Sequence, residues 1–372
     1  MSNKLAIYAF SGDPITFGHL DIIKRARQLF PKVLVAIGTN PDKNYLFSAQ
    51  QREQLAKKAL KHLVGVSVKH FDGLLVDFAY EQGASVIIKG VRDAQDFQYE
   101  QTLNSVGLSQ QHGLETVILF TKPTLAHISS STVKALQKAQ GLVQDYVPLP
   151  TKTALEQRLS NQTLIGITGE IASGKTYVAE KLIELGKKQG REVYNLDLDS
   201  LAHQIQNGLK QPRYKKIRQQ LLTEFGRGIQ RKDGSIDRKK LGEIVFAEPK
   251  KLKLLNQIMW QPVLVRLRRE LVGKQGLILI NSALLAEADL LSVCNNRFIL
   301  VEANKTTQRD RLKQRGLSAA QINRRLKSQL STAKKQQLIK QSINQHHFGK
   351  LWKITEKTPL DSFAKKFFSE LS

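Results

Sequence analysis

Residues 169–176 read Gly-Glu-Ile-Ala-Ser-Gly-Lys-Thr, which fits the phosphate-binding loop pattern Gly-x-x-x-x-Gly-Lys-Ser/Thr without a gap. A short apolar, β-branched run precedes it at 164–168, and apolar residues recur at helical spacing from 174 to 186. In a strand, glycine-rich turn and helix, backbone N–H groups and a helix N-terminus can surround a polyphosphate. We therefore expect this part of the chain to be a parallel-sheet, nucleotide-binding fold.

The loop pattern assigns a role to each position. Lys175 is expected to reach the β- and γ-phosphates of ATP, and the Thr176 hydroxyl is expected to hold Mg²⁺. The positions expected to contact the nucleotide through the loop are Gly169, Ala172, Ser173, Gly174 and Thr176.

Two carboxylates follow the next strand-like segment, 192–196, in the sequence Asp197-Leu198-Asp199. At the carboxyl end of a strand beside a phosphate loop, Asp197 can serve Mg²⁺ through water, and Asp199 can accept a proton from a hydroxyl. The alternative is that Asp199 caps a helix that begins at Ser200.

Length and charge suggest more than one domain. The 372 residues exceed one ordinary domain. Residues 1–160 hold 18 Lys and Arg against 13 Asp and Glu, a net +5, whereas residues 161–372 hold 40 against 19, a net +21. Such an excess favours anionic ligands, and it also allows non-specific nucleic-acid binding that the activity does not require.

Other features of composition indicate a cytoplasmic protein. The best candidate for a membrane span, near 276–293, is interrupted by Asn281, Glu287 and Asp289. The apolar run among the first residues is too short for a signal peptide. The single cysteine, Cys294, excludes an intrachain disulfide. We expect neither a membrane span nor binding to a membrane.

The first 160 residues alternate between strand-like and helix-like segments, which predicts a doubly wound parallel sheet with ligands beyond the carboxyl ends of its strands. The strand candidates are 5–10, 33–38, 64–69, 85–88 and 116–120. The helical candidates are 18–30, 49–62, 75–82, 95–110 and 130–137.

Polar residues cluster where these strands are expected to end. Ser11 to His19 follow the first strand, Lys43 follows the second, and the stretch 89–100 follows the fourth. A histidine near a helix N-terminus and a phosphate is placed to donate to developing negative charge. Ser129, Ser130 and Ser131 open a helix with hydroxyls suited to phosphate or ribose oxygens.

The motifs SGDPITFGH, NPDK, FDGLLVDFA, KGVRDAQDFQYE, ETVIL and ISSS, in this order, resemble bacterial pantetheine-phosphate adenylyltransferases over residues 4–160. The resemblance implies a Rossmann-like nucleotidyltransferase of the HIGH type, which moves the adenylyl group of ATP onto 4′-phosphopantetheine. It implies catalytic roles for His19, Lys43 and Arg92. The substrate contacts that it implies are Ser11, Gly18, Leu75, Lys89, Gly90, Glu100, Ser129, Ser130 and Ser131.

One departure from this family concerns the first turn. Its Gly-Ser/Thr-Phe-Asp-Pro start appears here as Phe10-Ser11-Gly12-Asp13-Pro14, with glycine and phenylalanine exchanged. We expect Phe10 to obstruct the phosphate site unless the turn is reshaped.

The second part resembles dephospho-coenzyme A kinase through TGEIASGKT, LDLDSLAH, DGSIDRKKLGEIVF, SALLAE and FILVEA. The resemblance implies phosphoryl transfer from ATP to the 3′-hydroxyl of dephospho-coenzyme A, with Asp199 as the base and Lys175 in catalysis. Arg311 and Arg315, four residues apart, are expected to share a helical face and to act as lid arginines over the phosphates. Tyr177, Gln261 and Ala283 depart from this family's pattern.

The order of the two parts resembles the bifunctional coenzyme A synthases. We expect two doubly wound parallel-sheet domains, 1–160 and 161–372. Together they are expected to perform the last two steps of coenzyme A biosynthesis with ATP and Mg²⁺. Assembly into a homo-oligomer is compatible with this expectation. Two alternatives stay open. One is an adenylyltransferase for another phosphate acceptor, and the other is a weakened or non-catalytic basic domain that binds nucleic acid or membrane.

Overall fold

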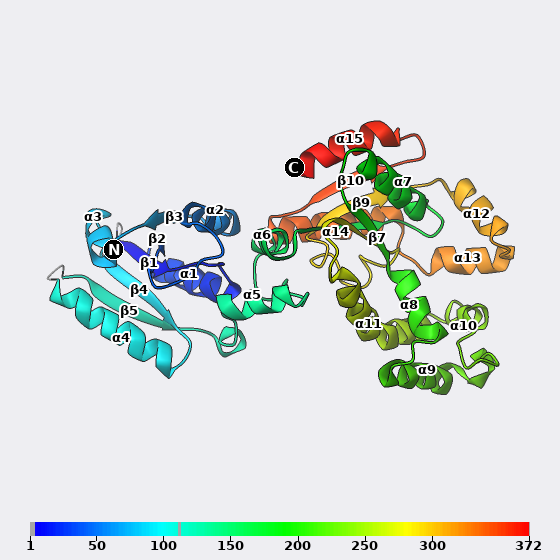
Figure 1. Cartoon of the computed structure of the whole chain (residues 1–372), viewed down its shortest axis with the longest axis horizontal. Helices are drawn as coiled ribbons and strands as arrows, with labels where there is room; N and C mark the ends of the chain where they lie inside the picture. Colours follow the sequence, from blue (N-terminus) through cyan, green and yellow to red (C-terminus); the bar gives the residue numbers. More distant parts are fainter. Residues whose placement is uncertain (1–3, 111–112, 372) are drawn as a thin grey trace. The chain divides into compact units, whose positions relative to one another are not determined.

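The computed structural model describes residues 4–110 and 113–371. They divide into two compact units, Met1–Leu159 and Ser160–Ser372, which are described separately below (Figure 1). Both units are parallel-sheet α/β folds, as the sequence predicted. Among the described residues, no helix combines the length and the hydropathy that crossing a bilayer requires.

The first unit contains a sheet of five parallel strands in the order β3-β2-β1-β4-β5. Its elements are β1 Leu5–Phe10, α1 Phe17–Leu29, β2 Lys32–Gly38, α2 Ala49–Leu60, β3 Val66–Phe71, α3 Leu75–Glu81, β4 Val86–Val91, α4 Ala94–Ser109, β5 Glu115–Phe120, the 3-10 turn η1 Pro123–Leu125, α5 Ser130–Lys138 and α6 Leu149–Ser160.

Two predicted strands differ from the observed ones. β3 begins at Val66, later than predicted, because Val64 lies exposed in the preceding turn. β4 continues past Ile88 to Val91, since Lys89, Gly90 and Val91 pair with β5.

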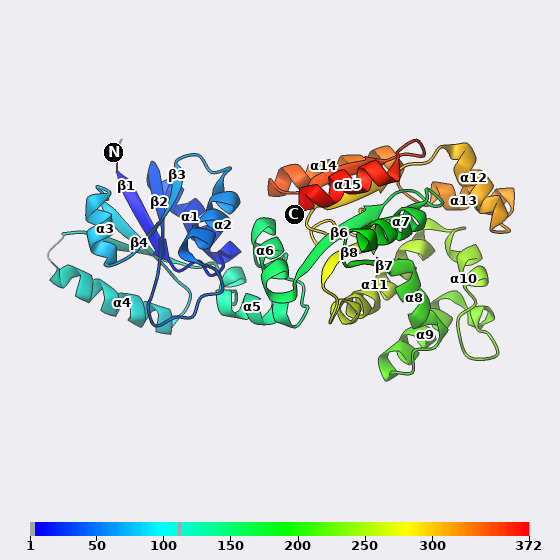
Figure 2. The ribbon, with the colours of Figure 1, turned by 45° about the horizontal axis from the view of Figure 1, so that its top comes forward.

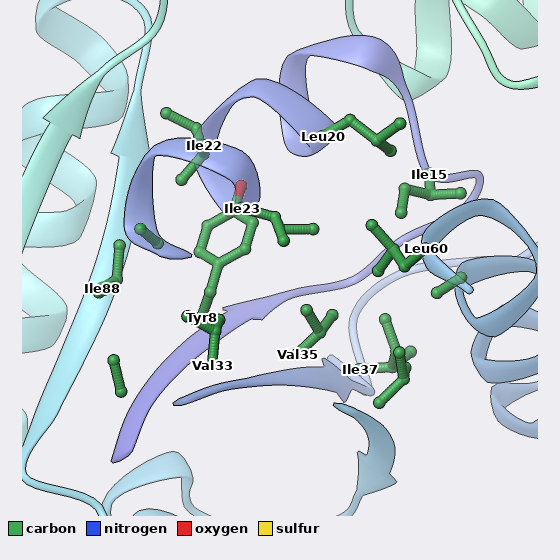
Figure 3. Packing of buried hydrophobic residues seen from close by; sticks show 14 of the residues in the cluster. Tyr8, Ile15, Leu20, Ile22, Ile23, Val33, Val35, Ile37, Leu60 and Ile88 are labelled. Carbon is green, nitrogen blue, oxygen red and sulfur yellow. The ribbon is translucent and has the colours of Figure 1, made fainter. Parts of the chain in front are cut away.

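Helices α1 and α2 cover one face of this sheet. Their apolar residues pack with β1, β2 and β4 in a cluster where the Tyr8 ring points toward α1, beside Ile22 and Ile23 (Figure 3). Helix α3 packs on the opposite face, through Ala79 against Ile7 and Ile87. β1 pairs with β2 on one side and β4 on the other, so the strand order reverses at β1, where ligands of such sheets bind.

The second unit contains a sheet of five parallel strands in the order β10-β9-β6-β8-β7. Its elements are β6 Gln162–Thr168, α7 Lys175–Lys188, β7 Val193–Asp197, α8 Leu198–Asn207, α9 Pro212–Phe225, the 3-10 turn η2 Arg227–Ile229, α10 Arg238–Val245, α11 Pro249–Leu271, β8 Gly276–Asn281, β9 Arg297–Val301, α12 Lys305–Gln314, α13 Ala319–Lys327, α14 Thr332–His346, β10 Lys350–Ile354 and α15 Leu360–Leu371.

Helices α7 and α15 lie side by side on one face of this sheet (Figure 2). Leu182 of α7 and Phe367 and Phe368 of α15 pack there against strand residues such as Ile167 and Ile299. β6 pairs with β8 and β9, so the strand order reverses at β6, and the loop that follows it enters the ligand-binding crevice of the sheet.

Candidate active sites

A cavity of about 980 Å³ opens over the carboxyl ends of the strands of the first unit. It is lined by the turns after β1, β2 and β4, by one side of α4 and by the start of α5. All of the site residues that the sequence predicted in this unit line it, namely Ser11, Gly18, His19, Lys43, Leu75, Lys89, Gly90, Arg92, Glu100, Ser129, Ser130 and Ser131.

His19 lies in the first turn of α1, and one of its ring nitrogens is fixed by the helix start. The backbone N–H of Thr16 donates to His19 Nδ1 at 3.0 Å, and the Thr16 hydroxyl lies 3.0 Å from the same atom. Because Nδ1 accepts, the proton of the neutral imidazole is on Nε2. Burial, with the nearby positive charge of Arg92, lowers the pKa of His19 to about 4. At neutral pH, His19 is therefore an uncharged Nε2–H donor.

Phe10 forms part of the wall of the cavity. Its ring lies parallel to His19, with ring centroids 4.3 Å apart and planes 12° apart, and both residues line the cavity. Gly12 has φ +65°, and a Cβ there would come within 3.1 Å of Phe10 Cε2. In this turn the residue in the left-handed region is Gly12, where glycine is favoured, and obstruction of the phosphate site by Phe10 stays a prediction.

Two basic residues of the cavity form ion pairs with acidic residues of α4. Lys89 forms an ion pair with Glu100 at 2.8 Å. Arg92 Nε lies 2.9 Å from Asp96 Oδ2. Both ion pairs lie at the wall of the cavity formed by the end of β4 and the start of α4.

Helix α5 presents the predicted serines at its N-terminus. Ser129 caps the helix by accepting from Thr132 N at 3.0 Å, and Ser130 Oγ donates to Pro14 O at 2.8 Å. The serines are therefore tied to the turn after β1, beside the free N–H groups of a helix start.

Two charged residues that sequence reasoning missed support this turn. Lys134 lies 2.6 Å from Asp13, whose carboxylate also accepts from the backbone N–H groups of Leu46 and Phe47. Arg52 is 1% exposed and donates to the carbonyls of Ser11 and Gly38. The sequence signal for Arg52 was its place on the apolar stripe of α2, where a charge needs buried acceptors.

In the second unit, the phosphate loop joins β6 to α7 as predicted from the motif. Gly169 has φ +152°, and a Cβ there would come within 2.2 Å of Val301 O, so no larger residue fits. Ser173 is buried, whereas Thr176 is exposed in the first turn of α7. The loop also contains Ala172 and Gly174, both with positive φ.

Lys175 bends back over its own loop. Its Nζ donates to Glu170 O at 3.0 Å and to Gly169 O at 3.3 Å. Burial lowers the pKa of Lys175 to about 8, and the charges of Asp199 and Asp197 oppose that effect. Lys175 and both aspartates therefore belong to one electrostatic site.

Asp197, not Asp199, caps the helix after β7. Asp197 Oδ1 accepts from the N–H groups of Asp199 at 2.8 Å and Ser200 at 3.2 Å, and α8 begins at Leu198. The alternative that Asp199 is the cap is wrong, because the helix starts two residues earlier than that alternative required. Reduced hydration and the neighbouring charge of Asp197 raise the pKa of Asp199, as suits a group that accepts a proton.

Arg311 and Arg315 lie near the loop, but they do not share a helix as predicted. α12 ends at Gln314, and Arg315 is the residue that follows it. Arg311 Nη1 donates to Ala172 O at 3.0 Å, and the charge of Arg315 acts on Lys175.

Glu170, inside the loop, was also missed. It is 5% exposed, and its carboxylate accepts from Thr332 N at 2.9 Å and Thr332 Oγ1 at 3.0 Å and pairs with Lys305. Gln329 Oε1 accepts from Ile171 N at 2.9 Å. The loop is thereby attached to the starts of α12 and α14.

The second unit offers few side-chain oxygen atoms near the phosphate loop as ligands for a magnesium ion. No group of three or more His, Cys, Asp or Glu within residues 4–110 and 113–371 is arranged to hold a metal. Of the two residues that the sequence predicted for Mg²⁺, Thr176 is exposed at the start of α7, and Asp197 accepts hydrogen bonds as the cap of α8.

Fold and sites together define a two-part transferase, a nucleotidyltransferase followed by a P-loop kinase. Residues 11–136 match the cytidylyltransferase-like family and residues 163–347 match the dephospho-CoA kinase family. The chain belongs to the phosphopantetheine adenylyltransferase family through its N-terminal part, and its C-terminal part carries the dephospho-CoA kinase match.

Curated relatives and one solved structure illustrate the similarity. The phosphopantetheine adenylyltransferase of Caldanaerobacter subterraneus subsp. tengcongensis is 44% identical over 145 residues, which are 39% of this chain and 91% of that protein. That of Geotalea daltonii is 40% identical over 160 residues, 43% of this chain and 99% of that protein. A dephospho-CoA kinase from Campylobacter jejuni aligns with 57% of this chain and 98% of its own, at 20% identity and a TM-score of 0.36.

Proposed function

We propose that this chain is a bifunctional coenzyme A synthase, which performs the last two steps of coenzyme A biosynthesis. The observation that carries the proposal is that two groups of residues suited to binding phosphates lie on one chain, in the order of the two reactions. Adenylyl transfer to 4′-phosphopantetheine gives dephospho-coenzyme A, which is the acceptor of the second reaction.

In the first step, a phosphate oxygen of 4′-phosphopantetheine attacks the α-phosphorus of ATP while the bond to the β-phosphate oxygen breaks and pyrophosphate leaves. Two polyanions must approach, so the site mainly neutralises charge and needs no covalent intermediate. His19 donates through Nε2–H to the charge that develops at the α-phosphate, and Lys43, Lys89 and Arg92 supply positive charge. The neutral tautomer described above supports this role.

The remaining residues of the cavity would hold the two substrates. We assign the serines of α5, with Glu100, Gly90 and Gly18, to ATP, and Ser11 and Leu75 to the pantetheine side. These assignments follow the family motifs, and the shared cavity supports them.

In the second step, Asp199 accepts the proton of the 3′-hydroxyl of dephospho-coenzyme A, whose oxygen attacks the γ-phosphorus of ATP, and ADP leaves. Lys175 and the loop amides hold the β- and γ-phosphates, and Arg311 and Arg315 add charge from the side of α12. The raised pKa of Asp199 and its electrostatic contact with Lys175 support this assignment.

Magnesium is the cation we propose for both steps, where it would reduce the charge of the triphosphate. In the second unit, Thr176 would bind it directly and Asp197 would bind it through water. Replacing Thr176 with valine should raise the Mg²⁺ concentration that half-saturates the kinase, and a Thr176→Ser control should not.

The proposal is tested by two substitutions in the full chain. His19→Ala should abolish the formation of dephospho-coenzyme A and leave phosphorylation of supplied dephospho-coenzyme A intact. Lys175→Ala should do the reverse, so that dephospho-coenzyme A accumulates. Normal coenzyme A formation by Lys175→Ala would show that the kinase assignment is wrong, and normal adenylyl transfer by His19→Ala would refute the first half.

A further inference from the structure

The imidazole of His19 is held from two directions by different residues. Thr16 bonds to the Nδ1 edge, and the ring of Phe10 covers one face at a centroid distance of 4.3 Å. The ring of Phe10 also contacts the ring of Tyr8, at a centroid distance of 4.9 Å and a tilt of 35°. Tyr8 is itself buried in the cluster under α1 (Figure 3), so Phe10 contacts both a core residue and His19.

The position of Phe10 is not that of an ordinary core residue. It is only partly buried, and it lines the cavity together with His19. Its ring has the space that Gly12 leaves, since a Cβ at Gly12 would come within 3.1 Å of Phe10 Cε2 and 3.2 Å of Ile37 Cδ1. The turn is therefore built so that an aromatic ring can lie against the histidine.

We propose that Phe10 is a positioning residue for adenylyl transfer, which keeps the plane of the His19 ring fixed so that Nε2–H points into the cavity. This inference depends on the proposed adenylyltransferase function. Both contacts at Nδ1 come from Thr16 and hold one edge of the ring, so the opposite edge, which carries Nε2, can still rock about the bond between Cβ and Cγ. A flat neighbour at stacking distance opposes that rotation, because turning the imidazole brings its edge against the face of Phe10.

The expected effect is on geometry and not on the charge of His19. The charged groups that line the cavity with His19 are Asp13, Asp42, Lys43, Lys89, Arg92, Asp96, Glu100 and Lys134, and the tyrosines that line it are Tyr8, Tyr45 and Tyr99. The Phe10 ring itself has two opposing influences, since it excludes water and also presents a π-face to an imidazolium. Rates are therefore to be compared at neutral pH, where His19 is uncharged.

Two substitutions at position 10 distinguish the effect of a planar aromatic ring from the effect of an apolar side chain of similar size. Phe10→Leu keeps an apolar side chain without a flat face, and Phe10→Tyr keeps the flat face. Phe17→Leu is a matched control, because Phe17 packs against the same cluster without lining the cavity. For each full-length protein, kcat and the KM values for ATP and 4′-phosphopantetheine are measured, with circular dichroism as the check of folding.

We expect Phe10→Leu to lower kcat about tenfold while both KM values stay within about twofold, the pattern of an interaction that acts in the transition state. Phe10→Tyr and Phe17→Leu should remain near the wild type. Nitrogen NMR of ¹⁵N-histidine protein, with the His19 signals identified by their loss in His19→Gln, should show the Nε2–H tautomer in the wild type and averaged signals in Phe10→Leu.

Four results would overturn the inference. The first is a wild-type kcat in Phe10→Leu, and the second is an equal loss of kcat in Phe10→Leu and Phe10→Tyr. The third is an equal loss of kcat in Phe17→Leu. The fourth is unfolding of Phe10→Leu, which would assign Phe10 to the core alone. If the wild type itself makes no dephospho-coenzyme A, the proposed function fails instead, and the two failures are thereby distinguished.

Discussion

The pKa of Lys175 is set by burial and by the charged residues around it. Burial lowers its pKa to about 8, and Lys335 and Arg315 act in the same direction, while Asp199 and Asp197 oppose them. Its ammonium group is meanwhile held by the carbonyls of its own loop. A polyphosphate would replace these carbonyl contacts with a stronger, charge-assisted pair.

This environment predicts a pH limit for the kinase. With a lowered pKa, free Lys175 is protonated below pH of about 8 and loses its charge as the pH rises through that value. Since kcat/KM reports the free enzyme, kcat/KM for ATP should fall as the pH rises through about 8. The measurement is a pH profile of phosphorylation of supplied dephospho-coenzyme A.

A variant that cannot lose its charge provides the control for this pH profile. Lys175→Arg stays protonated, so whatever activity it keeps should lack the decline. If the wild type shows no decline until the pH approaches about 10, where an unperturbed lysine titrates, the burial argument is contradicted.

At the scale of elements, the phosphate loop is attached to helices far along the chain through Glu170. Burial alone would raise the pKa of Glu170, but the hydrogen bonds from Lys305 and Thr332 outweigh it and leave the pKa lowered. Glu170 therefore connects β6 and α7 with the starts of α12 and α14.

Removing this carboxylate should destabilise the second unit. Glu170→Ala leaves the Thr332 N–H without its partner, and we expect the free energy of unfolding to fall by about 1–3 kcal/mol. Because the folded pKa is lowered, the contribution of Glu170 is present above the unfolded pKa of about 4.3 and is lost as the pH falls through the folded pKa.

Urea unfolding at neutral pH measures the effect of Glu170→Ala. Glu180→Ala, an exposed carboxylate on α7, is the matched control and should change the free energy by no more than about 0.5 kcal/mol. Equal effects of the two substitutions would contradict a specific role for the Glu170 contacts.

The sequence predicted the buried strands well because parallel strands are continuous apolar runs, as in β1 and β6. It did not predict β10, an edge strand with an exposed lysine at its start, or the polar helix α14, whose periodicity is weak. Tertiary contacts stabilise such elements, and local sequence does not encode those contacts.

The candidate sites were predictable where a motif specifies them. The loop around Lys175 and the residues around His19 fall into this class. Arg52 and Glu170 were not predicted, because their partners are tens to more than a hundred residues away in sequence. The sequence alone could not show whether Asp197 or Asp199 caps the helix, because both are suitable capping residues. The first residue of α8, Leu198, identifies Asp197 as the cap.

For the whole molecule, each unit has its own hydrophobic clusters and its own candidate site. Among the residues that the structure describes, those that line the cavity lie between Tyr8 and Lys134. Leu155 of α6 packs with Phe47, Val143 and Val147 of the first unit. We therefore propose that a functional boundary falls after α6 and not before it.

Two fragments test this boundary. Residues 1–161 should fold and keep adenylyl transfer within about twofold of the full chain, since a domain with its own core is expected to fold alone. Residues 1–148 lack α6, expose the cluster around Val147 and should melt at a lower temperature. An inactive 1–161 fragment, or a 1–148 fragment of equal stability, would contradict the proposed boundary. Homo-oligomerisation and nucleic-acid binding stay predictions.

The central claim is that one chain performs two successive transfers on the same cofactor precursor. The most direct test incubates the wild-type protein with 4′-phosphopantetheine, ATP and Mg²⁺ and resolves dephospho-coenzyme A from coenzyme A over time. We predict that dephospho-coenzyme A appears first and is converted to coenzyme A, with one pyrophosphate and one ADP released per coenzyme A. Absence of dephospho-coenzyme A, or its accumulation without any coenzyme A, would contradict the account.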